Sequence, residues 1–234
     1  VPILKSWLVR KKSEALKIVE KHQPFPLVLK PTQGSHGDDV YVNIENIEEL
    51  KPLLDRVLKG SPEDGCLIEK YFAGRDLRVS VVGDQAVAVL ERIPAHVIGD
   101  GKHTIRQLVK KFNQHPLVGE GYEKPICKIH LDAEAKRILN KQQLIPSSVP
   151  DKNVKVFLRH NANISTGGIG QDVTDEIPTK IKNIAVSASQ AVGLEVCGVD
   201  LLYDDITDSA VVLELNDVAG IDVHHYPMIG QARD

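Results

Sequence analysis

Three side chains near the end of the sequence carry oxygen atoms that suit a hard metal ion. Glu214 and Asn216 are two residues apart in the stretch 209–222, and Asp200 lies in the preceding apolar run 197–203. Side chains alternate across a strand, so Glu214 and Asn216 share one face, while the leucines that flank Glu214 point into a core. If the two runs pair as a hairpin, Asp200 projects over the same face, and this set predicts magnesium together with a nucleotide. The alternative interpretation is an exposed hairpin with ordinary surface charges.

A second candidate site begins at the end of the apolar run 26–31. Lys30 lies at the end of this run, and the loop 32–38 that follows contains Gly34, Ser35 and Gly37. Backbone amides of glycines can approach phosphate oxygens closely, and the ammonium group adds a mobile positive charge. The pattern is not a P-loop, because the lysine precedes the glycines. The alternative is an ordinary β-hairpin turn.

The segment 69–76, Glu-Lys-Tyr-Phe-Ala-Gly-Arg-Asp, marks the end of another predicted strand. Backbone groups at such an edge can pair with the Watson-Crick side of adenine, and the Asp76 carboxylate could accept hydrogen bonds from ribose hydroxyls. The alternative is a charged turn between two strands.

Two arginines and an asparagine lie at or just past the ends of predicted strands, namely Arg92, Arg159 and Asn163. Guanidinium groups bind carboxylate or phosphate through paired hydrogen bonds, and they stabilise negative charge that builds up during phosphoryl or acyl transfer. The alternative is that these arginines are solvated or ion-paired surface residues.

The composition limits the kind of protein. With 234 residues and a net charge of −3, the chain has room for one large or two small domains. A nearly balanced charge argues against general adhesion to nucleic acid or membranes, and no apolar run is long enough to cross a bilayer. The three cysteines are far apart in the sequence, which fits buried thiols in a reducing cytosol, so a cytoplasmic location is expected.

Helical and extended patterns alternate along the chain. Apolar spacing predicts helices over residues 13–22, 46–59 and 178–192, with strands between them. From residue 99 to 148 the sequence changes to helices and polar loops, which indicates an insertion. The alternation without internal repeats is typical of an α/β or α+β enzyme with two lobes.

The order of these pieces resembles the ATP-grasp superfamily: a lysine at a strand end, a glycine loop, a Glu-Lys-aromatic segment, an acidic strand and Glu-x-Asn. Within it, the blocks 90–105, 119–125 and 163–168 resemble the ATP-grasp parts of the cyanophycin synthetases and of the bifunctional glutamate-cysteine ligase/glutathione synthetases. The resemblance covers essentially the whole chain.

The resemblance implies an α+β ATP-grasp fold, in which two α/β lobes hold ATP between them. Residues 1–75 would form the small lid lobe with the glycine loop. Residues 76–234 would form the C-terminal lobe with the metal site and a helical insertion at about 99–148. In the relatives another phosphate-binding lysine lies upstream of a segment like Val1-Pro2, so that lysine and the N-terminal lobe are expected outside this chain.

The implied activity is that of a carboxylate-amine ligase, which forms an amide or peptide bond through an acyl phosphate. The implied cofactors are ATP and two magnesium ions, with manganese as an alternative. The implied substrates are amino acids or peptides, without nucleic acid or membrane partners. A homodimer or homotetramer of a longer protein with further domains is the expected assembly.

Transferred residue by residue, the resemblance assigns contacts to the nucleotide. Lys30 would contact the α and β phosphates. The backbone of Lys70 and Phe72 would hold adenine, and Asp76 or Glu69 would hold the ribose. The lid over the triphosphate would consist of Gly34, Ser35, His36 and Gly37.

The resemblance also assigns the metal and the reacting groups. The metal ligands would be Asp200, Glu214 and Asn216. The groups facing the transferring phosphoryl group and the acyl phosphate would be Arg92, Arg159 and Asn163. The tail resembles the region where relatives seat the second substrate, with His224 and His225 as candidates there or as structural residues.

Two other functions fit parts of the pattern. A catalytically incomplete Mg-ATP-binding module of a larger protein fits the expected absence of the upstream lysine. A kinase-like phosphotransferase fits less well, because no catalytic loop with an aspartate precedes the metal strand.

Overall fold

The computed structural model describes residues 1–33, 39–60, 63–121 and 123–233. The chain divides into two units, a smaller one over Ile3–Ala73 and a larger one formed by Val1–Pro2 and Gly74–Asp234. Each unit has its own buried apolar core.

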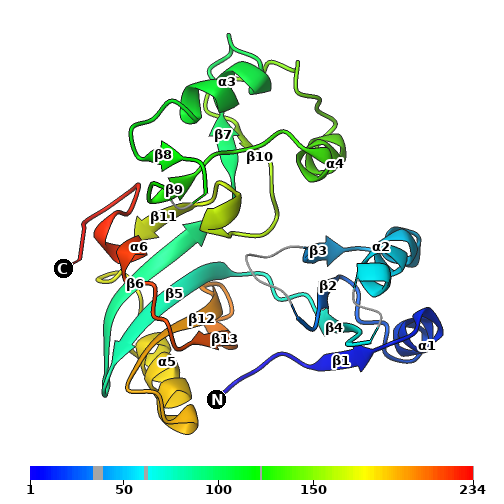
Figure 1. Cartoon of the computed structure of the whole chain (residues 1–234), viewed down its shortest axis with the longest axis vertical. Helices are drawn as coiled ribbons and strands as arrows, with labels where there is room; N and C mark the ends of the chain where they lie inside the picture. Colours follow the sequence, from blue (N-terminus) through cyan, green and yellow to red (C-terminus); the bar gives the residue numbers. More distant parts are fainter. Residues whose placement is uncertain (34–38, 61–62, 122, 234) are drawn as a thin grey trace. The chain divides into compact units, whose positions relative to one another are not determined.

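The smaller unit is an antiparallel sheet with two helices on one face (Figure 1). The strand order is β1-β4-β2-β3, with bounds β1 (Ser6–Val9), β2 (Leu27–Pro31), β3 (Tyr41–Ile44) and β4 (Cys66–Lys70). The helices are α1 (Lys12–His22) and α2 (Ile47–Gly60), close to the predicted ranges. Leu50, Leu54 and Val57 of α2 recur every three to four residues, so they form one stripe that is buried against the sheet.

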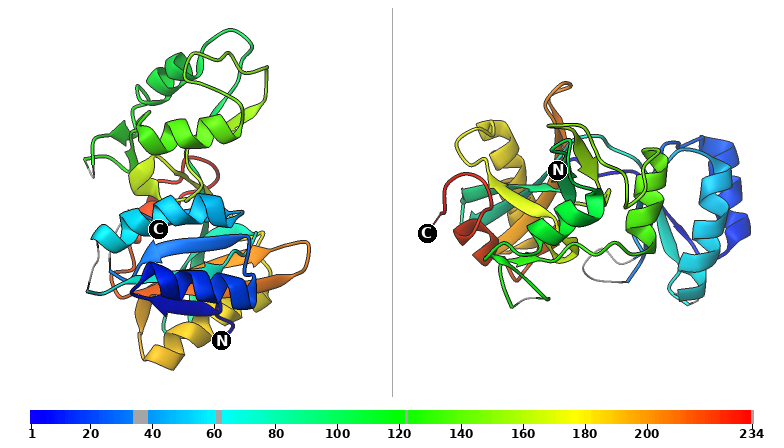
Figure 2. Two further views of the ribbon diagram at one scale, coloured as in Figure 1. Left: turned by 90° about the vertical axis from the view of Figure 1, so that its right-hand side faces the viewer. Right: turned by 90° about the horizontal axis from the view of Figure 1, so that it is seen from above.

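The larger unit is built on a five-stranded antiparallel sheet with the order β11-β6-β5-β12-β13. The strands are β5 (Arg75–Val82), β6 (Gln85–Ile93), β11 (Ile169–Asp172), β12 (Val196–Asp204) and β13 (Ser209–Asn216). Helix α5 (Thr179–Val192) covers one face of this sheet (Figure 1 and Figure 2). Alternate residues such as Leu77, Val79 and Val199 point to this helix and are fully buried. The other residues of each strand therefore face the opposite side.

The predicted hairpin of the two acidic runs is confirmed, because β12 and β13 pair directly. The prediction that both leucines flanking Glu214 enter the core is wrong for Leu213. A β-bulge follows the Asp200–Glu214 pair, and Leu201 then pairs with Val212. Leu213 is the extra residue of the bulge, so Val212 takes the buried position.

Residues 94–160, drawn mainly in green in Figure 2, have a separate small core. The elements of this region are β7 (His96–Ile98), α3 (Ile105–Phe112), β8 (Val118–Gly119), β9 (Ile126–Cys127), α4 (Ala133–Lys141) and β10 (Lys155–Phe157). A 3-10 turn, η1 (Ile164–Thr166), leads back to β11, and α6 (Asp222–His225) lies in the C-terminal tail.

The structure also bears on membrane-spanning helices and on the cysteines. No helix in the described part of the chain combines the length and the apolar composition needed to cross a bilayer. All three cysteines are buried and free, and burial raises the pKa of the Cys66 thiol to about 11.

Helix α5 offers a matched test of the core of the larger unit. Ile181→Ala removes a side chain that is 1% exposed, so we expect the free energy of unfolding to fall by about 2 to 5 kcal/mol. Val192→Ala changes the same helix at a side chain that is 63% exposed, so its effect should stay within about 0.5 kcal/mol. Urea unfolding measures both, and equal losses would contradict this packing of α5.

Candidate functional site

The sheet face that α5 leaves uncovered carries a row of charged side chains. Strand pairing places Asp200 opposite both Arg78 and Glu214, and it places Asp76 opposite Arg92. Directly opposite residues of antiparallel strands point to the same face. Five charged groups from four adjacent strands therefore converge there.

Asp200 is held by two arginines. The guanidinium of Arg78 forms a two-pronged pair with the Asp200 carboxylate, and its Nη2 lies 3.0 Å from Oδ2. Arg92 donates from Nη1 to the same Oδ2 at 3.1 Å, and from Nε to Asp76 Oδ1 at 2.7 Å. Two carboxylates thus balance two guanidinium groups in one connected network.

Burial and charge act against each other in this network. Burial raises the pKa of Asp76, and the nearby Arg92 guanidinium opposes that rise. Burial also lowers the pKa of Arg92, but Asp76 and Asp200 outweigh it, and the net effect is a raised pKa. Arg92 is therefore a permanently charged group whose position is fixed by two carboxylates.

Sequence reasoning missed Arg78, although a signal was available. Arg78 alternates with the fully buried Leu77 and Val79, so it shares the face of Asp76. Gly198 leaves room for it: a Cβ atom there would lie 3.0 Å from Arg78 Cδ and 2.8 Å from the carbonyl oxygen of Ala219. The guanidinium can lie along the sheet only because this neighbour has no side chain.

Glu214 and Asn216 complete the oxygen-rich set. The Glu214 side chain is exposed, and no residue in the described ranges pairs with its carboxylate. The Asn216 Nδ2 atom is buried without a hydrogen-bond partner. Across those ranges, His, Cys, Asp and Glu side chains alone form no group of three that could hold a metal. An ion at this edge of the sheet would therefore need the amide oxygen of Asn216 as well, and the donor set fits a hard cation.

Arg159 and Asn163 follow β10 along the chain. Arg159 is buried, with Nη1 donating to the Leu158 carbonyl at 3.0 Å and Nη2 pairing with Asp132 at 2.6 Å. Asn163 precedes the turn η1, and its carbonyl oxygen accepts hydrogen bonds from Thr166 and Gly168. In the described part of the chain, no hydrogen bond or ion pair joins either side chain to Asp200.

The predicted nucleotide contacts lie mostly in the smaller unit. Lys30 of β2 forms an ion pair with Glu69 of β4 at 2.9 Å. Lys70 ends β4, Phe72 follows it, and the intervening Tyr71 amide donates to the Pro26 carbonyl at 2.9 Å. The predicted lid residues Gly34, Ser35, His36 and Gly37 lie outside the described residues.

The C-terminal tail lies against the charged face of the larger unit. Ile229 forms a parallel bridge to Gln171 of β11, and Arg233 pairs with Asp172 at 2.7 Å. His224 is only 3% exposed, and neither of its ring nitrogens has a hydrogen-bond partner. Burial, followed by the positive charge of Arg78, lowers the pKa of His224 to about 4.

Solved structures place this arrangement in a known fold. The structure of a bifunctional glutathione synthetase from Pasteurella multocida superposes with a TM-score of 0.66 at 32% identity, covering 99% of this chain and 33% of that one. A D-alanine–D-alanine ligase from Bacillus anthracis shares the fold at a TM-score of 0.51 and 14% identity, covering 93% of this chain and 51% of that one. The class of fold is ATP-grasp, as predicted.

Sequence comparison gives the family. The RimK-like ATP-grasp domain matches residues 1–100 and 157–230, so the chain belongs to this family. It is 34% identical to a cyanophycin synthetase of Trichormus variabilis, over 100% of this chain and 26% of that protein. It is 39% identical to the glutathione biosynthesis bifunctional protein GshAB of Clostridium perfringens, over 94% of this chain and 29% of that protein. The chain thus spans about a quarter of the length of these relatives, and the predicted resemblance is confirmed.

Because His224 is buried, the free energy of unfolding should depend on pH. The charged and titratable groups around His224 are Arg78, Asp172, Asp222 and His225. An unfolded histidine titrates near pH 6.5, so between pH 6.5 and pH 4 the unfolded state binds more protons and stability falls as the pH falls. Between pH 7 and pH 4.5, we expect wild type to lose on the order of 2 kcal/mol more unfolding free energy than His224→Leu.

The control for this measurement is His22→Leu, which removes an exposed histidine that has no carboxylate partner among the described residues. This variant should keep the pH dependence of wild type in urea unfolding. If His224→Leu also keeps it, the neutral buried state of His224 is wrong.

Proposed function

We propose that the chain is the ATP-grasp part of an ATP-dependent carboxylate-amine ligase. One observation supports it most: strand register sets Asp200 opposite Glu214, with Asn216 next on the same face and two guanidinium groups beside them. Oxygen ligands next to fixed cations suit a metal-bound triphosphate and the charge that develops when its terminal phosphoryl group is transferred.

The reaction we propose has two steps. A substrate carboxylate oxygen attacks the γ phosphorus of ATP, and the bond between this phosphorus and the β-phosphate oxygen breaks. ADP departs, and the substrate becomes an acyl phosphate. An amine then attacks the acyl carbon, the C–N bond forms as the C–O bond to phosphate breaks, and the amine loses a proton. The products are an amide or peptide, ADP and inorganic phosphate.

Asp200, Glu214 and Asn216 would hold magnesium, and we expect two ions, with manganese as an alternative. A bound divalent ion would neutralise charge on the phosphate oxygens. Asp200 is the residue shared between this role and the arginine network, which would keep its carboxylate in place. Glu214 has an unpaired carboxylate, so it would supply most of the negative charge that is not already neutralised next to the ion.

Arg92, together with Arg159 and Asn163, would face the transferring phosphoryl group. Arg92 is already held in position by two carboxylates, so little reorganisation would be needed at the moment of reaction. Loss of one such donor typically raises a barrier by roughly 3 to 4 kcal/mol.

Residues of the smaller unit would bind the nucleotide. Lys30 would leave its ion pair with Glu69 and bind the α and β phosphates instead. The backbone of Lys70 and Phe72 would hold adenine. Asp76 or Glu69 would hold the ribose, although the Asp76 carboxylate is bonded to Arg92, which favours Glu69 for that role. Gly34, Ser35, His36 and Gly37 would form the lid.

The relatives suggest the substrates and setting. Their names refer to cyanophycin and to glutathione, so we expect amino acids or peptides as the acid and the amine. These relatives are much longer than this chain, so we expect further domains in the full-length protein. We also propose that the full-length protein is a cytoplasmic homodimer or homotetramer.

A catalytically incomplete nucleotide-binding module is the second candidate. Asp200 and Lys30 are both engaged in ion pairs, and such a module could bind Mg-ATP through them without turnover. Thermal melts that show magnesium-dependent protection by ATP, together with no ADP release for any substrate pair, would favour the module.

Glu214→Gln tests the proposed metal site. Removing one negative charge from the ion should lower magnesium-dependent ADP release by the full-length protein at least about 100-fold, since even outer-shell changes cost 10- to 100-fold. Coupled-enzyme detection of ADP, with a panel of amino acids and dipeptides, measures the effect.

Glu195→Gln is the matched control, because Glu195 is an exposed glutamate just before β12. It should leave ADP release unchanged. A stable amide with free phosphate identifies a ligase, whereas a stable phosphorylated product would mean a kinase and would overturn the proposal.

A further inference from the structure

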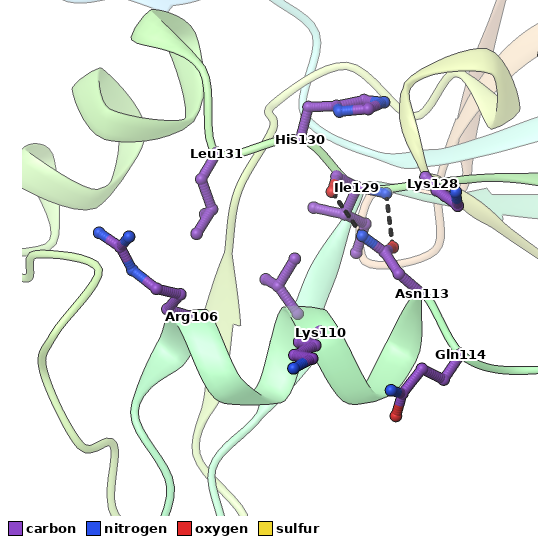
Figure 3. A pocket seen from close by; sticks show the side chains of 9 residues that line it. Arg106, Lys110, Asn113, Gln114, Lys128, Ile129, His130 and Leu131 are labelled. Atoms are coloured by element: carbon purple, nitrogen blue, oxygen red, sulfur yellow. Dashed lines mark hydrogen bonds between the residues drawn. The ribbon is translucent and has the colours of Figure 1, made fainter. Parts of the chain in front are cut away.

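An open groove lies along α3 in the region that the family match leaves uncovered, residues 101–156 (Figure 3). Its volume is about 440 Å³. One wall is α3 with the turn after it, and the other is the extended segment 128–131. We call this feature the α3 groove.

The α3 groove has an apolar floor and a rigid frame. Val109, Ile129 and Leu131 line it, and Val109 and Ile129 are nearly fully buried. The Asn113 side chain joins the two walls, since its amide donates to the Ile129 carbonyl and accepts from the Ile129 amide, each at 2.9 Å. Figure 3 shows this pair of hydrogen bonds at one end of the groove. The walls are therefore held at a fixed separation before any ligand arrives.

The rim of the α3 groove is basic. Arg106 and Lys110 lie one helical turn apart on α3, so their side chains are neighbours on one side of the helix. Both are exposed, and neither has a hydrogen-bonded or ion-paired side-chain partner in the part of the chain that the structure describes. None of the nine lining residues is acidic.

The opposite wall already holds a carboxylate. Lys128 Nζ lies 2.8 Å from Glu120 Oε1, and His130 Nε2 lies 3.7 Å from Glu120 Oε2. The Lys128 hydrogen bond lowers the pKa of Glu120, so this carboxylate stays charged. Glu120 thus pairs with Lys128 and lies near His130, whereas Arg106 and Lys110 have no such carboxylate among the described residues.

We propose that the α3 groove binds an acidic peptide segment, with two carboxylates pairing to Arg106 and Lys110 and the peptide chain lying on the apolar floor. Charge complementarity selects an anionic ligand, and the floor of aliphatic side chains suits a peptide. Single-stranded nucleic acid is a poorer fit, because such ligands stack mainly on the rings of Phe, Tyr and Trp, and none of these lines the groove.

This site is independent of the proposed ligase reaction, since binding needs neither ATP nor metal. The test measures fluorescence anisotropy of a labelled hexa-aspartate peptide with the full-length protein, without nucleotide. Hexa-asparagine has the same length and no charge, and an oligonucleotide of equal charge tests the nucleic-acid alternative. We expect hexa-aspartate to bind, with an affinity that falls as salt is added, and the other two to bind at least about tenfold more weakly.

The decisive variant is Arg106→Glu with Lys110→Glu, which should weaken hexa-aspartate binding at least about tenfold. Lys111→Glu is the matched control, because Lys111 is an exposed neighbour on α3 that does not line the groove. It should change binding less than about threefold. Circular-dichroism melts establish that each variant is folded.

Three results would overturn the proposal: no binding of hexa-aspartate at low salt, equal weakening by the double variant and by Lys111→Glu, or tighter binding of the oligonucleotide. ADP release measured on the same samples separates this outcome from a failure of the ligase proposal.

Discussion

The charged face of the larger unit depends on one carboxylate that two guanidinium groups share. Asp200 joins Arg78 to Arg92, and Arg92 joins Asp76, so charges from three adjacent strands stabilise one another. Each of these groups would be costly to bury alone, and removing one partner would leave an uncompensated charge. The network therefore fixes the positions of the arginines, while the sheet beneath it is held by the apolar core on the opposite face.

One face of this sheet carries the apolar core, and the other face carries the charged side chains. The face under α5 supplies the stability, through aliphatic side chains that alternate with the charged ones along the same strands. Because each strand contributes to both faces, the register that packs the core also sets the geometry of the site. The bulge after Asp200 shifts that register by one residue just beyond the Asp200–Glu214 pair, so the pair remains aligned while Val212 enters the core.

The region of residues 101–156 has a different character. It lies outside the family match, has its own small core and carries the basic α3 groove. In the smaller unit, Lys30 and Glu69 form an ion pair across adjacent strands.

The sequence by itself determined the elements, the family and the pairing of the two acidic runs. Those features follow from local periodicity and from motif order, which are properties of the chain read in one direction. It could not show that Arg78 reaches Asp200, because that contact joins residues more than a hundred positions apart and requires the open space above Gly198. Nor could it show that Arg159 pairs with Asp132, or that His224 is buried without a partner. Only tertiary structure decides such contacts, because burial and charge pairing depend on which distant strands are packed side by side.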